Sequence, residues 1–305
     1  MDTPQDHPAP PPGHALIPRQ AHSDDQVVAL WLMGHESRHT RDNYRRCAEA
    51  FLDDLGKPLA RITVGDLQCW RQGLETRGLK PATVANRTAI AKSLLRFAHR
   101  IGYLPFNPGE LLKSPRLKTD LAERLLSEQQ IKALIEATKG RDRAILLTLY
   151  GAGLRVSELC GLRVKDLRFR DAEKGDDTPK EVVLTVFGKG GKTRFVAVRP
   201  KVAEALAAQI KGRSREAPVF PSPKNPAKSI TPRQVQRIVQ RAAQDAGLDV
   251  DVTPHWLRHG LASHALDKGA PLHLVQHTLG HANVATTSRY LHVRGDEGAG
   301  LLLDL

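Results

Sequence analysis

A chain of 305 residues favours two domains, and 46 Lys and Arg against 33 Asp and Glu give a net charge of +13 that favours a polyanionic partner such as nucleic acid. The three cysteines, Cys47, Cys69 and Cys160, are odd in number and widely separated, which excludes a disulfide framework and a paired-cysteine metal site. No apolar run reaches the ~18 residues of a membrane span, and the acidic, proline-containing start has no signal-peptide core, so we expect a cytoplasmic protein with no membrane partner.

The first part of the chain combines a proline-rich segment with a helical module. Residues 1–21 hold prolines at 4, 8, 10, 11, 12 and 18 and almost no periodic apolar pattern, which is typical of a disordered tail. From 22 to 110, apolar spacing and capping residues predict helices throughout. Their expected limits are a cap at Ser23 or Asp24, a start at Thr40 and stop at Gly56, a start at Thr63 and Asp66, and a last helix from Pro81 to Gly102.

The second part of the chain follows a charged segment, 111–126, that is interpreted as a linker. Residues 127–305 open on a capping box, Ser127 with Gln130, and the pattern then predicts helices at 141–150, 154–162, 200–211 and 232–246. Two β-like runs, 181–187 and 195–199, flank Gly188-Lys189-Gly190-Gly191-Lys192 and predict a hairpin with a basic tip. The expected fold class is therefore mainly α (α+β): an all-α first domain and a mainly helical second domain with a small β-hairpin sheet.

Several basic and aromatic residues stand at the predicted helix ends of the second domain. Arg155 lies at a helix start in Gly153-Leu-Arg-Val-Ser-Glu-Leu159. His255 and Arg258 are three apart, hence on one face of the helix that Thr253-Pro254 opens. His281 follows the helix that Gly280 ends, and Tyr290 comes nine residues later.

This set of motifs resembles the tyrosine recombinase, or phage integrase, family, and the Xer-type bacterial members most closely. Each motif alone is weak, but six catalytic positions in the family order are specific. The helical segment SRHTRDNYRR resembles the family's core-binding domain. The resemblance implies a SAM-like N-terminal domain and a DNA-breaking-rejoining enzyme fold. The matching motifs are GLRVSEL with Arg155, GKGGK with Lys189, HWLRH with His255 and Arg258, LGH with His281, and Tyr290.

The resemblance implies DNA strand cleavage through a covalent 3′-phosphotyrosine at Tyr290. A tyrosine hydroxyl has a pKa of about 10 and needs help to lose its proton and attack phosphorus. Arg155 and Arg258 would hold the non-bridging phosphate oxygens with their planar forks, and His281 would add a donor.

Two further residues would move protons. His255 would accept the tyrosine proton, and Lys189 would protonate the departing 5′-oxygen, with Lys192 at the same turn as its rival. Because one ester replaces another, we expect neither ATP nor a metal, and no cofactor.

The resemblance also implies that the helices at 40–55 and 83–101 cross the DNA groove, although a solvated charged face is the alternative interpretation. The expected contacts, mostly to phosphate, are Thr40, Arg41, Arg45, Thr83, Asn86 and Arg87. The expected partners are a double-stranded DNA recombination site and the other subunits of a tetramer on two such sites. That tetramer is either a homotetramer or a heterotetramer with a second Xer-type recombinase.

The C-terminal end departs from the Xer pattern, because glycines at 295, 298 and 300 precede an apolar Leu301-Leu-Leu-Asp-Leu305. We expect residues 301–305 to insert into an apolar groove of the adjacent catalytic domain, with a frayed terminus as the alternative.

Three other functions fit parts of the sequence. His35-Glu-Ser-Arg-His39 spells the zinc-protease signature, but Gly34 and Thr40 predict a loop or fraying end rather than one helix with both histidines. A type IB topoisomerase shares the catalytic set, although the small N-terminal module argues against it. A catalytically silent DNA-binding regulator has no need of Tyr290. Among recombinases, chromosome dimer resolution, mobile-element integration and transposition all stay open as the biological role.

Overall fold

The computed structural model describes residues 20–115, 125–170, 181–188 and 191–280. The chain divides into two compact units, Met1–Thr119 and Asp120–Leu305, and each is described by itself. Of the predicted tail 1–21, only the last two residues are described, and Ala21 is buried in the core of the first unit. Within these ranges no helix is long and apolar enough to cross a membrane.

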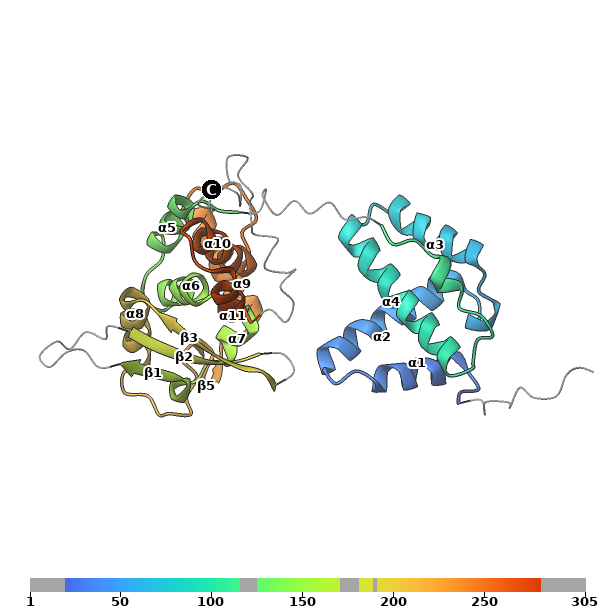
Figure 1. The fold of residues 1–305 in the computed structure, drawn as a ribbon, viewed down its shortest axis with the longest axis horizontal. Helices are drawn as coiled ribbons and strands as arrows, with labels where there is room; N and C mark the ends of the chain where they lie inside the picture. Colours follow the sequence, from blue (N-terminus) through green and yellow to red (C-terminus); the bar gives the residue numbers. More distant parts are fainter. Residues whose placement is uncertain (1–19, 116–124, 171–180, 189–190, 281–305) are drawn as a thin grey trace, which may run out of the picture. The chain divides into compact units, whose positions relative to one another are not determined.

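Between residues 20 and 115, the first unit is all-helical (Figure 1). Its helices are α1 (Asp24–Met33), α2 (Arg38–Leu55), α3 (Val64–Thr76) and α4 (Pro81–Arg100), with short 3-10 turns η1 (Leu59–Arg61) and η2 (Pro108–Leu111). Aromatic side chains from different helices fill the core: Trp31 stacks on Tyr44, and Phe51 lies edge-on against Trp70. The expected all-α fold of this part is confirmed.

Local capping explains where these helices begin and end. Ser23 caps α1, and Thr63 and Asp66 form a reciprocal capping box at α3. The predicted start of α2 at Thr40 is wrong by two residues, because the Ser37 hydroxyl accepts the Thr40 backbone N–H and the helix begins at Arg38. Gly56 ends α2 in the left-handed conformation, at φ 58°.

The segment between the units is shared by their two cores. Turn η2 packs against α3 and α4, and Lys92 of α4 donates to the Leu112 carbonyl at 2.7 Å. Leu112 is buried in the core of the first unit and Leu126 in that of the second. Both residues lie inside the predicted linker 111–126, whose bounds stay a prediction.

The second unit surrounds a central helix, α6 (Gly140–Ala152), which is buried along most of its length (Figure 1). Helices α8 (Pro200–Ile210) and α10 (Pro254–Asp267) pack directly against it. The remaining helices are α5 (Glu128–Glu136), α7 (Val156–Gly161), α9 (Pro232–Asp245) and α11 (Leu272–Leu279), with the 3-10 turn η4 (Val164–Asp166). The predicted capping box at Ser127 is present, and Thr231 forms a second one with Gln234 at the start of α9.

A three-stranded antiparallel sheet in the order β1-β2-β3 lies beside these helices. The predicted hairpin is confirmed as β2 (Glu181–Phe187) and β3 (Thr193–Val198). The sequence did not indicate β1 (Leu167–Arg170), a short, charge-interrupted strand, or the small sheet of β4 (Pro221–Ser222) and β5 (Asn225–Ser229). One face of β2 and β3 is buried, and Arg194 is the charged residue among the valines that β3 directs to that face.

Candidate active site and predicted DNA-contact helices

Arg155 stands at the start of α7, just beyond the turn that ends α6. Gly153 makes this turn at φ 60°, and an added Cβ there would lie 2.5 Å from a methyl group of Leu261. The Arg155 backbone N–H donates to Glu158 Oε2 at 2.8 Å, and its Nη1 donates to Oε1 at 2.9 Å. Glu158 therefore holds both the backbone and the side chain of Arg155, whose side chain is still 34% exposed.

Arg258 and His255 come from the first turns of α10, as the sequence predicted. Arg258 is only 4% exposed, and its two Nη atoms donate to the carbonyls of Gly153 and Leu279. His255 is exposed in the first turn of the same helix, next to the buried Pro254. The pKa of His255 lies below its usual value, because neighbouring groups partly desolvate the ring and because Arg258 and Arg155 add positive charge nearby.

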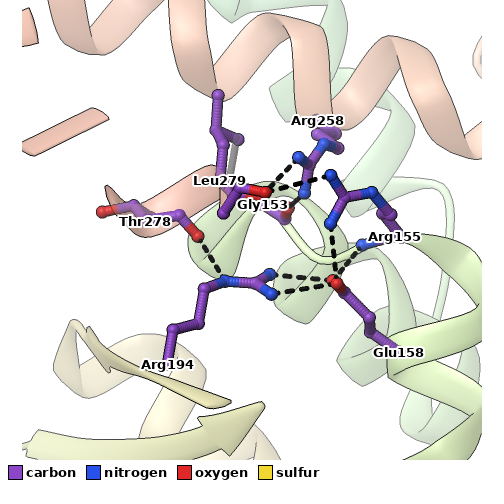
Figure 2. Close-up of polar contacts among 8 residues, drawn as sticks. Gly153, Arg155, Glu158, Arg194, Arg258, Thr278 and Leu279 are labelled. Atoms are coloured by element: carbon purple, nitrogen blue, oxygen red, sulfur yellow. Dashed lines mark hydrogen bonds and ion pairs between the residues drawn. The ribbon is translucent and has the colours of Figure 1, made fainter. Parts of the chain in front are cut away.

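The end of α11 gathers three arginines from three other elements (Figure 2). Gly280 ends this helix at φ 63°, and the last carbonyls of a helix have no partner within it. These carbonyls also form the negative end of the helix dipole, which favours cations. Three successive carbonyls accept from three guanidiniums: Thr278 from Arg194 at 2.8 Å, Leu279 from Arg258, and Gly280 from Arg155 at 3.3 Å.

Arg194 was missed in the sequence analysis. It is 7% exposed and binds Glu158 through both Nη atoms, at 2.9 Å and 2.8 Å. Burial alone would raise the pKa of Glu158, but hydrogen bonds from Arg194 and the Arg155 backbone hold that pKa below its usual value. The alternation of β3 carries a signal for Arg194, because it shares the inner face with Val196 while Phe195 is exposed.

Comparison with known proteins identifies this arrangement. The model of the Phage integrase family matches residues 124–297, and that of the Phage integrase, N-terminal SAM-like domain matches residues 28–102. The chain belongs to the phage integrase family of tyrosine recombinases. This family consists of enzymes that cleave and rejoin DNA, so the expectation of a DNA-breaking-rejoining enzyme is confirmed.

Relatives of this recombinase include bacterial Xer proteins. The tyrosine recombinase XerC of Thermodesulfovibrio yellowstonii is 36% identical over 85% of this chain and 87% of its own. That of a Mycobacterium species is 34% identical over 88% of this chain and 92% of its own.

Solved structures share the fold of the recombinase at lower identity. A lambda integrase dimer bound to a COC′ core site superposes with a TM-score of 0.68 at 21% identity, over 90% of this chain and 77% of that one. The XerH recombinase bound to its difH substrate gives 0.66 at 21% identity, over 90% and 83%. These likenesses confirm the expected mainly helical catalytic fold.

Three of the six predicted catalytic residues of the recombinase are described, and they are brought together: Arg155, His255 and Arg258. Lys189, His281 and Tyr290 lie outside the described residues. Gly188 and Lys192, which flank Lys189, close the hairpin turn through a 2.8 Å backbone hydrogen bond. Gly280, whose carbonyl accepts from Arg155, directly precedes His281 in the chain. The roles of all six residues stay predictions.

The predicted DNA contacts lie on α2 and α4, which pack against each other in the first unit. Arg45, Thr83 and Asn86 are exposed, whereas Thr40, Arg41 and Arg87 are half-buried. Arg41 donates to the His35 carbonyl at 3.1 Å, so part of its guanidinium is used within the unit. Contact with DNA stays a prediction for each of them.

Arg41 of α2 and Arg87 of the neighbouring α4 lie near opposite ends of α2. The pKa of Asp54, near the end of α2, is lowered first by hydrogen bonding from Arg77 and also by the charge of Arg87. Arg41 lies near the start of α2, about 20 Å from Asp54 at 1.5 Å per residue. These two basic positions therefore span most of the helix.

The zinc-protease pattern falls across a helix boundary. His35 lies between α1 and α2, and its ring packs edge-on against Tyr44 at 4.6 Å, while His39 is inside α2. The two histidines therefore do not share one helix, as that chemistry requires. In the described ranges, no three potential metal ligands lie close together.

Proposed function

We propose that this recombinase performs site-specific strand exchange through a 3′-phosphotyrosine intermediate at Tyr290. The observation that carries the proposal is the meeting of Arg155 and Arg258 at the end of α11. Phosphoryl transfer needs fixed positive donors where charge develops on the phosphate oxygens. Two guanidiniums held by carbonyls and by Glu158 supply such donors without reorganising during the reaction.

A residue of this chain is assigned to each bond that forms or breaks in the proposed step. The Tyr290 oxygen forms a bond to phosphorus, and its proton passes to His255. The bond from phosphorus to the 5′-oxygen breaks, and that oxygen takes a proton from Lys189. The lowered pKa of His255 supports this role, because a neutral imidazole at neutral pH can accept a proton. A 5′-hydroxyl from a second duplex then reverses the step.

We also propose that the enzyme acts as a tetramer on two DNA sites, alone or with a second Xer-type recombinase. A groove of about 820 Å³ between α5, α6, α8 and α10 supports this assembly. Its lining includes apolar, basic and acidic side chains: Ile131, Leu147 and Leu261; Lys132, Arg143, Arg199, Lys201 and Lys268; and Glu128 and Glu136. The two glutamates pair with Lys268 and Lys132, so Arg143, Arg199 and Lys201 carry the remaining positive charge. Residues 301–305 of a neighbouring copy contain four leucines, which complement the apolar lining, and Asp304, which complements the basic residues.

Deleting residues 300–305 tests the assembly. The truncated protein should bind a single site normally and be slower in synapsis and coordinated cleavage, measured on paired sites. Recombination at the wild-type rate would remove the docking role.

Nicked suicide DNA tests the chemistry, because loss of a short 5′-fragment traps the covalent complex. The wild type should give a protein–DNA band that withstands denaturation and persists in EDTA. Tyr290→Phe should bind the same DNA equally well and give no band, since it lacks only the nucleophilic oxygen. A band in the variant, or one that appears only with added Mg²⁺ or Zn²⁺, would overturn the proposed chemistry.

A further inference from the structure

Glu158 lies between two arginines that share it unequally (Figure 2). Arg194 takes both carboxylate oxygens with its two Nη atoms, at 2.9 Å and 2.8 Å. The Arg155 side chain reaches one oxygen only, at 2.9 Å, while its backbone N–H takes the other at 2.8 Å. Two parallel bonds make the stronger arginine–carboxylate geometry, and Arg194 holds it.

Arg194 is also fixed at its other edge. Its Nε donates to the Thr278 carbonyl at 2.8 Å, so every nitrogen of this guanidinium has a partner. A Cβ added to Gly280 would lie 3.1 Å from Arg194, so the glycine leaves room for the side chain at the end of α11. Because Glu158 holds both Nη atoms and the Thr278 carbonyl holds Nε, Arg194 presents to a DNA phosphate no nitrogen that lacks a protein partner.

Arg155 is more exposed than Arg194 and less tightly bound. Its side chain is 34% exposed, and its contact with the Gly280 carbonyl is long, at 3.3 Å. A guanidinium has five N–H donors, of which the described part of the chain engages two on Arg155. The other donors are the ones that the proposed function assigns to the scissile phosphate.

We propose that Arg194 is a positioning residue for DNA cleavage, which occupies Glu158 and the end of α11 so that the Arg155 guanidinium stays available to the phosphate. This inference rests on the proposed function. Without Arg194, Glu158 would draw Arg155 into a two-bond fork, and the Thr278 carbonyl would lose its donor. Arg194 stands on β3, the strand that follows the Lys189 turn, so its ion pair with Glu158 links that strand to α7.

The first test replaces Arg194 by Met, with Arg168→Met as the matched control. Arg168 is an exposed arginine on β1 of the same sheet. Covalent complex formation on nicked DNA at saturating protein should be roughly 10–100-fold slower in Arg194→Met, the scale for losing a residue that orients a reactive group. The DNA dissociation constant should stay within about twofold, and the control should match the wild type.

A double-mutant cycle separates positioning from general support of the fold. In an Arg155→Ala background, Arg194→Met should slow cleavage no further, because the group through which it acts is gone. Independent, multiplying losses would overturn the inference.

Arg194→Met leaves Glu158 buried with less compensation, so it can impair folding. Glu158→Gln combined with Arg194→Met removes both charges and the carboxylate that would capture Arg155. This pair should cleave faster than Arg194→Met alone, or, if that variant does not fold, faster than Arg155→Ala. A folded double variant that cleaves as slowly as these single variants would contradict the inference.

The inference and the proposed function fail in different ways. A wild type that forms no covalent complex would overturn the proposed function, whereas wild-type cleavage by folded Arg194→Met would overturn only the role of Arg194.

Discussion

The arginines of the cluster in the second unit and the predicted DNA-contact arginines of the first unit are held in different ways. In the second unit, Arg194 and Arg258 are 7% and 4% exposed and are bound by a carboxylate or by backbone carbonyls. In the first unit, Arg45 is exposed, and Arg41 gives one hydrogen bond to a carbonyl. Desolvating a cation costs free energy and requires dedicated partners, whereas an exposed cation attracts phosphate at long range. The basic residues that contribute to the net charge of +13 therefore include buried arginines bound within the protein and exposed ones.

The largest effect is expected when an arginine of the cluster is removed. Arg258→Ala and Arg155→Ala should each slow single-turnover cleavage by ~10²–10³-fold, the loss expected for one donor at a developing oxyanion. DNA affinity should change far less. Arg258→Ala should also lower the thermal midpoint more than Arg155→Ala, because it leaves the Gly153 and Leu279 carbonyls without this donor in a buried site. Equal losses of affinity and rate would mean that these arginines serve binding.

The hairpin turn offers the next test. Lys189→Ala should slow cleavage by about 10²-fold, and a 5′-phosphorothiolate substrate should restore the rate, because sulfur departs without a proton. Lys192, which is exposed at the same turn, is the matched control. Rescue of Lys192→Ala in place of Lys189→Ala would assign the proton to the second lysine.

The pH dependence of cleavage tests the proposed role of His255. His255 must be neutral to accept a proton, and its folded-state pKa is lowered from 6.5. The rate should therefore be maintained down to about pH 6.5 and be lost only as pH falls through the lower folded pKa. Cleavage rates between pH 5 and 9, with an NMR titration of the His255 ring, check this. A midpoint above 6.5 would contradict the role.

The smallest effect is expected in the first unit. Arg45→Ala should weaken binding about equally on all DNA sequences and reduce the slope of log K against log salt by about one. The cleavage rate at saturating protein should stay unchanged. An unchanged slope would place Arg45 away from the DNA.

Local signals in the sequence predicted much of this molecule. Serine and threonine caps, and glycines such as Gly56 and Gly280, marked helix ends that the structure reproduces. The predicted start of α2 was wrong because Ser37 and Thr40 are both residue types that cap helices, and only the backbone geometry decides between them.

The missed part of the site depends on contacts between distant segments. Arg155 reaches a carbonyl 125 residues away, and Arg194 reaches a carboxylate 36 residues away. The sequence of β3 does not indicate that Glu158 and Thr278 are the partners of Arg194. An arginine on the buried face of a strand does indicate that it has some partner. The pairing of Glu158 with Arg155 was the local half of the network, since the two share one turn.

We propose that the arginine cluster serves attack by Tyr290 on a DNA phosphate. Mass spectrometry of the trapped suicide complex, after digestion by nuclease and trypsin, identifies the residue that carries the DNA. Cleavage after Arg289 and Arg294 releases the peptide Tyr290-Leu-His-Val-Arg294. The account predicts that this peptide carries the added mass of a nucleotide, joined to the tyrosine through its 3′-phosphate. An adduct on another peptide, or a linkage through a 5′-phosphate, would contradict it.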